Sequence, residues 1–290
     1  MATTHRLMVK LPAHSRIQRV FDTSINLVET GNTQAVSTHR EYTDDVTATS
    51  DSYHVVRTQT TFTITPATAP NDNFQSAWWQ ARYQNIPTMI YTTGPYFYPR
   101  TVENWDDIKA PLMAMTQGSS NVQTQTATHN LFDMLTPASA AKFMLTPDML
   151  LAFAREKDLI VGTPEVTDSV MPSPIGNGNI TYHSTYTMLS WDESADDAEA
   201  EYDFQPDPQM LSALMKTLLP TLMGQGVPKA TLDKVVADIK VENRTHCHYS
   251  VAISTGLIRK AECQMNSIVH VLDYDQSRVT NYTISETLLP

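Results

Sequence analysis

Strand-like segments gather in blocks at the two ends of this chain, and helix-like segments lie between them. The clearest strand is 52–65, where His54 and Val56 alternate with Val55 and Arg57, as on a pleated sheet whose successive side chains point to opposite faces. Strict alternation of strands and helices indicates a parallel sheet, whereas strands in blocks indicate an antiparallel one. We therefore predict an α+β fold. A long, curved antiparallel sheet, shaped like half a barrel, is expected to pack on a few helices.

The expected elements follow from hydrophobic periodicity and from turn and cap residues. Strands are predicted at 6–11, 16–29, 36–49, 52–65, 86–93, 96–101, 179–191, 199–204, 240–254, 257–274 and 278–288. Helices are predicted at 74–83, 102–115, 137–145, 148–157, 208–224 and 230–239.

Two polar segments lie between these elements. Residues 164–178, with three prolines and two glycines, are expected to form a loop, and the Gln/Thr/Ser-rich segment 116–128 is expected to be a linker. A linker there divides the chain into a β-rich lobe, 1–125, and an α+β lobe, 126–290. One continuous domain is the alternative.

Composition excludes several classes of function. The formal charge of −11, with 31 acidic and 20 basic residues, argues against nucleic acid as a partner, because binding a phosphate backbone needs clustered Lys and Arg. No run approaches the ~18 apolar residues of a transmembrane helix. The first residues show no apolar leader segment, so a secreted protein would have to lack its leader in this chain.

The two cysteines are predicted to form a disulfide. If Thr255 is the centre of the turn at Ser254–Gly256, antiparallel pairing places Cys247 opposite Cys263, within reach of a disulfide bond. A shift of one residue in register would separate them onto opposite faces, leaving two buried thiols. A disulfide would imply an oxidising, extracytoplasmic compartment: periplasm, cell surface or medium.

The same hairpin offers a candidate metal site. His246 and His248 lie on one strand face, and Glu262 is expected opposite His248. Two imidazoles and a carboxylate suit a metal used for binding or for hydrolysis. The alternative is a polar row on the solvent-facing side of the sheet.

A Met- and Leu-rich helix provides a candidate apolar ligand site. Methionine is flexible and polarizable, so a Met-bearing surface adapts to varied apolar partners. The helix is predicted at 208–224, and core packing is the alternative role for its apolar side chains. The candidate ligand-binding residues are Met210, Leu214, Met215, Leu218 and Met223.

Short motifs resemble a loose set of uncharacterised bacterial envelope or secreted β-rich proteins. The motifs are Val102–Asn104–Trp105 leading to Lys109, Trp191–Asp192 through Tyr202 to Asp207–Pro208, and Ser254–Ile258 followed by Lys260–Glu262. The Ser254–Ile258 turn also resembles hairpins of periplasmic lipoprotein carriers. That resemblance implies an open half-barrel around an apolar cavity, and it implies no active-site residues.

Three hypotheses follow for the function. The first is a non-catalytic extracytoplasmic protein that binds an apolar small molecule, a lipid or a protein partner in a concave face, without an intrinsic cofactor. The second is a metal-binding protein or metal-dependent hydrolase that uses His246, His248 and Glu262. The third is a structural subunit of a surface assembly.

Overall fold

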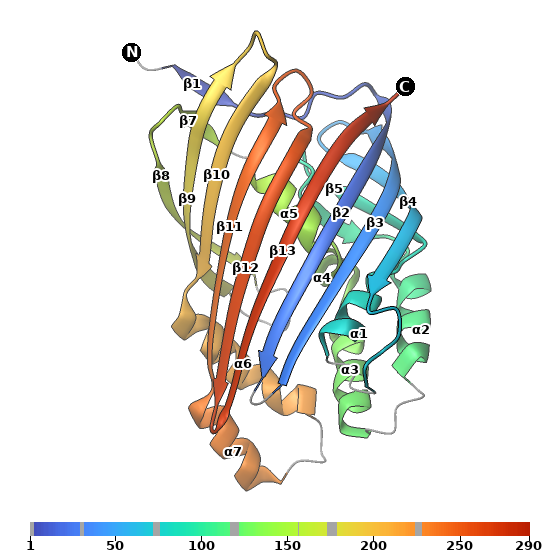
Figure 1. Ribbon diagram of the computed structural model, residues 1–290, viewed down its shortest axis with the longest axis vertical. Helices are drawn as coiled ribbons and strands as arrows, with labels where there is room; N and C mark the ends of the chain where they lie inside the picture. Colours follow the sequence, from blue (N-terminus) through green and yellow to red (C-terminus); the bar gives the residue numbers. More distant parts are fainter. Residues whose placement is uncertain are drawn as a thin grey trace.

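The computed structural model is organised around one antiparallel sheet of 11 strands in the order β6-β5-β4-β3-β2-β13-β12-β11-β10-β9-β8 (Figure 1). The structure describes residues 3–29, 32–71, 76–116, 122–155, 157–172, 179–223 and 228–290. Strands from both predicted lobes join this sheet, because β2 pairs with β13 over the whole of its length from residue 16 to residue 29. The prediction of an antiparallel sheet combined with helices is confirmed.

The strands that form the main sheet are long at its centre and shorter towards its edges. They are β2 (His14–Glu29), β3 (Asn32–Ala48), β4 (Tyr53–Thr65), β5 (Thr88–Thr93), β6 (Pro99–Val102), β8 (Glu165–Pro172), β9 (Asn179–Asp192), β10 (Asp197–Pro206), β11 (Lys240–Ala252), β12 (Ile258–Val271) and β13 (Tyr274–Leu289). A separate pair consists of β1 (Thr4–Arg6) and β7 (Asp158–Ile160).

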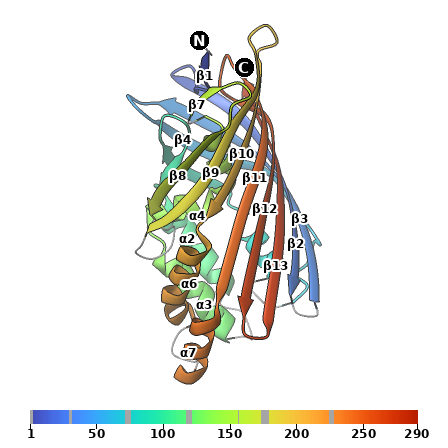
Figure 2. The ribbon, with the colours of Figure 1, turned by 90° about the vertical axis from the view of Figure 1, so that its left-hand side faces the viewer.

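The helices gather on one side of the sheet, and Figure 2 shows β4 and β8 turning towards that same side. We call this face, which the helices cover, the inner face. The described helices are α1 (Ala77–Arg82), α2 (Trp105–Thr116), α3 (Val122–Met134), α4 (Pro137–Met144), α5 (Thr146–Phe153), α6 (Pro208–Met223) and α7 (Lys229–Asp238).

Alternation along the central strands decides which side chains face the helices. In β2 the odd-numbered residues from Ser15 to Leu27 are buried, while the even-numbered residues between them are exposed or half-buried. The inner face therefore carries the core, which the helices complete with residues such as Leu150 on α5 and Phe132 on α3. The outer face is polar, as is usual for the solvated side of an antiparallel sheet.

The predicted strand at 6–11 is wrong in its position. Strand pairing covers Thr4–Arg6, with β7 as partner, and the chain then runs past the hairpin turn, where the Lys10 amide donates to the Thr255 carbonyl at 2.9 Å. Gly256 makes this approach possible. It has a φ of +71°, and a Cβ there would lie 2.2 Å from the Met8 carbonyl oxygen.

Two predicted irregular segments contain regular structure. Within 164–178, β8 pairs with β9 at the sheet edge, where a terminal proline costs no interior hydrogen bond. Within 116–128, the described residues from Val122 onward belong to α3, which buries Thr128 and Phe132. Polarity misled the prediction here, because helix packing needs only one buried stripe.

Candidate functional site

A partly enclosed cavity of about 580 Å³ lies between the inner face of the sheet and three helices. This volume is within the range of small-molecule sites, about 300–1,000 Å³. Strands β11, β12 and β13 provide the floor through Asn243, Met265, Ser267, Gln276, Arg278, Thr280 and Tyr282. Helices α1, α3 and α4 and the residues that follow them provide the cover through Gln80, Tyr83, Gln84, Ala127, Thr128, Leu131, Phe132, Phe143, Met144 and Thr146.

The strand register arranges the side chains of the cavity floor in rows. Asn243 pairs with Ser267, and Ser267 with Arg278, so three polar side chains cross the floor side by side. The neighbouring row contains Met265 opposite Thr280. The cover is richer in apolar groups, so the cavity has an apolar wall and a polar floor.

Arg278 is the one cation among the residues that line this cavity. Its Nη1 donates to Gln80 Oε1, and its Nε donates to Thr280 Oγ1 at 3.2 Å. In the part of the chain that the structure describes, no carboxylate lies within 4 Å of the guanidinium. Burial lowers the pKa of Arg278, against the opposing influence of Tyr282, as expected for a cation held away from water.

Deeper in the core, a separate set of charges is fully paired. We call it the buried ion network, and it consists of Arg19, Asp44, Arg57, Asp148, Arg155 and Glu286.

Each guanidinium of the buried ion network meets a carboxylate. Arg57 donates to Asp44 from Nε and Nη2, both at 2.8 Å, and to Asp148 at 2.7 and 2.9 Å. Arg19 donates to Asp148 and lies 3.1 Å from Glu286, while Arg155 donates to Glu286. Buried charges are retained only when they are paired in this way.

The buried ion network attaches α5 to the sheet. Asp148 is on α5 and Arg155 follows it, whereas the other members are on β2, β3, β4 and β13. Burial alone would raise the pKa of Asp148, but Arg57 and Arg19 keep it below the ordinary value. Three guanidinium groups and three carboxylates balance one another in charge, so the network supports the fold. Among its polar atoms, Arg155 Nη1 has no hydrogen-bond partner in the described residues.

The helix predicted at 148–157 has a Thr-Pro-Asp sequence at its start, which favours Thr146 as its N-cap. In the structure Leu145 is instead the N-cap of α5, and no side chain caps the helix. The Thr146 hydroxyl instead donates to the carbonyls of Lys142 and Phe143, both at 3.3 Å. Because α4 runs almost directly into α5, the carbonyls at the end of α4 compete for that hydroxyl.

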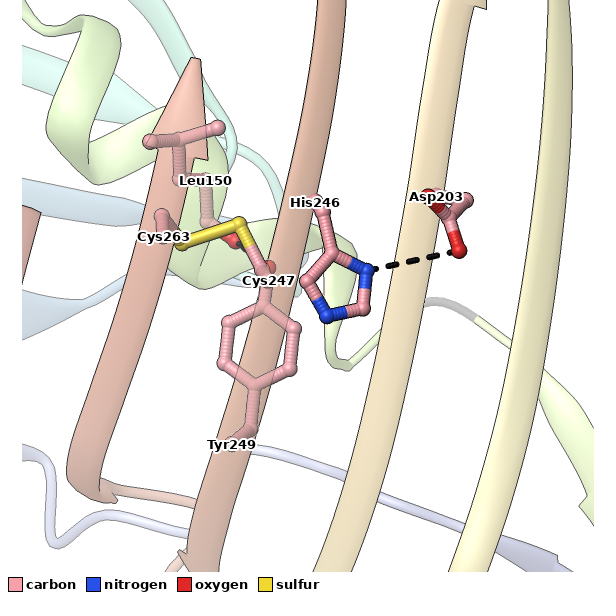
Figure 3. Close-up of a disulfide and its surroundings, with 6 residues drawn as sticks. All are labelled: Leu150, Asp203, His246, Cys247, Tyr249 and Cys263. Carbon is pink, nitrogen blue, oxygen red and sulfur yellow. Dashed lines mark hydrogen bonds and ion pairs between the residues drawn. A yellow bond between two sulfur atoms is a disulfide. The ribbon is translucent and has the colours of Figure 1, made fainter. Parts of the chain in front are cut away.

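The disulfide is present in the structure, between two buried cysteines (Figure 3). Cys247 pairs directly with Cys263, as the turn-centred register predicted. Tyr249, two residues further along β11, lies on the same inner face and donates from its hydroxyl to the Leu150 carbonyl at 2.8 Å. The cross-link therefore joins two strands directly beneath α5.

The histidines lie on the opposite, outer face. His248 is opposite Glu262, as expected, but His246 turns to Asp203 on β10 with a distance of 3.3 Å (Figure 3). Glu262 meets Lys260 at 2.9 Å, and this hydrogen bond lowers the pKa of Glu262. Among the described residues, no three metal-ligating side chains converge, and metal binding at His246, His248 and Glu262 stays a prediction.

The Met- and Leu-rich helix α6 lies away from this cavity. Met210 is exposed, Leu214 and Met215 are half-buried, and Leu218 is buried; the Met223 side chain falls outside the described residues. None of these four described side chains lines the cavity. A role for the α6 residues in ligand binding stays a prediction.

The sequence reasoning missed Arg278. A usable signal was present, since Thr280 and Tyr282 share its strand face and are buried. A basic residue at a core position of an amphipathic strand is unusual unless it is paired or functional.

Comparison with known proteins gives no family. No protein-family model matches the sequence, and no curated protein matches it significantly. The structure has weak similarity to lipovitellin, in a structure described for lipid–protein interactions, with a TM-score of 0.42 and 8% identity over 96% of this chain. The aligned part spans 25% of the lipovitellin chain.

Two proteins of Pseudomonas aeruginosa are less similar. OccK11 (OpdR) has a TM-score of 0.23 and 6% identity, covering all of both chains. OccK8 (OprE) has a TM-score of 0.25 and 6% identity, covering 96% of this chain and 98% of its own. Similarities at this level carry no functional argument. None of the helices in the described residues is long and apolar enough to span a membrane.

Proposed function

We propose that this protein binds an apolar or amphipathic small molecule in the inner-face cavity and has no catalytic role in doing so. The observation that carries this proposal is the cavity itself, about 580 Å³, whose cover combines aromatic and aliphatic side chains with a few polar ones. Concave sites with apolar walls and a few convergent polar groups are typical ligand sites.

We further propose that the protein works outside the cytoplasm. The support is the buried disulfide, because such bonds persist in oxidising compartments. The resemblance of the Ser254–Ile258 turn to hairpins of periplasmic lipoprotein carriers is in line with a carrier of apolar molecules.

The test is a fluorescence titration of the full chain with Nile red, a neutral apolar probe. Ala127 on α3 lines the cavity, so Ala127→Trp should fill part of it and weaken probe binding. Ala138→Trp is the matched control, because Ala138 is exposed on α4. Loss of binding in Ala127→Trp alone supports the proposal.

A second filling variant guards against a local effect on α3. Ser267→Phe enters the cavity from the floor on β12. Circular dichroism would confirm that both variants fold. Folded variants that bind Nile red as well as the unchanged protein would overturn the assignment of the cavity as the ligand site.

A further inference from the structure

We infer that the ligand of the inner-face cavity is a single-chain amphiphile with an anionic headgroup, and that Arg278 binds this headgroup. This inference rests on the proposed function and specifies its ligand. It is carried by the row of polar side chains on the cavity floor and by the excess of positive charge on the inner face.

The first argument is that Arg278 has N–H donors that the protein does not use. A guanidinium has five N–H donors, and the structure uses Nε on Thr280 and Nη1 on Gln80, both neutral acceptors. The nearby carboxylate at the end of β2, Glu29, accepts from Gln276 at 2.8 Å and lies beyond ion-pair distance of Arg278. Arg278 is half-buried; a cation that is partly removed from water and has only neutral partners is costly, and an anionic ligand would lower that cost.

The second argument is the balance of charge. The described residues that are at least nine-tenths buried include four arginines but three carboxylates. Arg40 is the surplus arginine: its Nη2 donates to Thr23 at 3.2 Å, and no carboxylate of the described residues lies within 4 Å of it. The inner face of a chain of net charge −11 therefore carries two arginines without a carboxylate partner among the described residues, the buried Arg40 and the half-buried Arg278.

The third argument is the order of the floor. Asn243 and Ser267 extend from Arg278 in one row across β11 and β12. The Asn243 side-chain oxygen is buried and has no hydrogen-bond partner among the described residues. That oxygen can only accept a hydrogen bond, whereas the Asn243 amide N–H groups and the Ser267 hydroxyl can donate to an anion. The row therefore places the Arg278 charge beside amide and hydroxyl donors on the cavity floor, opposite a cover that includes Leu131 and Phe132.

Carboxylate and phosphate headgroups share this chemistry, and the test separates them. Laurate, lauryl phosphate and lauryl alcohol have the same number of carbon atoms in an unbranched chain and differ in headgroup. Each would displace Nile red from the full-length protein at neutral pH. We expect the stronger anionic competitor to bind about tenfold or more tightly than the alcohol, the range of a charge-assisted hydrogen bond.

Arg278→Met keeps a flexible, unbranched apolar side chain and removes the charge of the guanidinium. It should abolish the preference for an anionic headgroup while leaving lauryl alcohol affinity unchanged, and Arg278→Lys should restore part of it. Arg244→Met is the control, since Arg244 is on the outer face of β11 and meets Asp203 at 3.2 Å. If Arg278 only supported the fold, its replacement would lower the melting temperature of the protein. We expect the Arg278→Met protein instead to unfold at an unchanged or higher temperature.

The outcomes distinguish the two proposals. Equal binding of the alcohol and both anions would overturn the inference and leave the proposed function standing. A preference for anions that survives in Arg278→Met would overturn the assignment of Arg278. Failure of Nile red itself to bind would overturn the proposed function, and with it the inference.

Discussion

Asp44 and Asp45 are neighbours in sequence on opposite faces of β3, and they allow a matched test of the buried ion network. Asp44 is fully buried, accepts two hydrogen bonds from Arg57 at 2.8 Å and lies 3.2 Å from Arg19 Nε. The side chain of Asp45 is 57% exposed, and its carboxylate meets Arg16 at 3.0 Å.

Asp44→Asn and Asp45→Asn each remove one negative charge with little change of shape. Removing one partner of a buried ion pair costs about 3–5 kcal/mol, because the remaining charge stays buried without compensation. Arg57 would keep Asp148 as a partner, which favours the lower part of that range. Removing an exposed pair costs about 0–1 kcal/mol.

The assay is urea unfolding followed by circular dichroism at neutral pH without reductant. With a slope of about 3 kcal/mol per M, Asp44→Asn should lower the unfolding midpoint by about 1 M. On the same slope, Asp45→Asn should lower it by less than about 0.3 M. Equal shifts in the two variants would refute the argument that internal pairing of these charges stabilises the fold.

Two further predictions concern the disulfide and one histidine. Replacing Cys247 and Cys263 together by Ala should lower the free energy of unfolding by about 3 kcal/mol, since the disulfide closes a loop with a sequence separation of 16. Equal urea midpoints for the oxidised protein and the double variant would contradict this. The pKa of His39 is raised by its hydrogen bond to Asp22 at 2.7 Å, so an NMR titration should place it above about 6.5 and Asp22→Asn should lower it. Because the folded-state pKa is the higher one, this contribution to stability is fully present below about pH 6.5 and is lost as pH rises through the folded pKa.

The sequence predicted those parts of the fold that local patterns control. The register predicted between β11 and β12 correctly placed Cys247 opposite Cys263, although an irregularity between Ser250 and Val251 shifts the pairing by one residue next to the turn. Asp207 directly precedes the predicted helix 208–224, as an N-cap residue should, and it caps α6 by accepting from the amides of Gln209 and Met210 at 2.9 and 2.8 Å. These features depend on residues close in sequence or related by one hairpin.

Features set by distant pairing were not predicted. The pairing of β2 with β13 joins residues more than 240 positions apart, and no local pattern specifies it. The buried ion network was equally invisible, because Asp44 and Asp45 are chemically identical in the sequence. Only the pairing of β3 with β2 and β4 shows that Asp44 faces the helices while Asp45 faces solvent.

The position of the inner-face cavity could not be predicted from the sequence for the same reason. The Met-rich helix α6 was the most apolar choice, but a cavity forms where helices do not fill the space over a sheet, and composition gives no information on unfilled volume.

The alternation of side chains along β13 does predict one residue of the cavity. Thr280 and Tyr282 identify the inner face of β13, and by the same parity Arg278 must face inward. A charge at such a position needs a partner, and the described residues supply Asp44, Asp148 and Glu286 to Arg19, Arg57 and Arg155 but no carboxylate to Arg278. The interior therefore separates into a paired set of charges that supports the fold and a surplus that a ligand can satisfy.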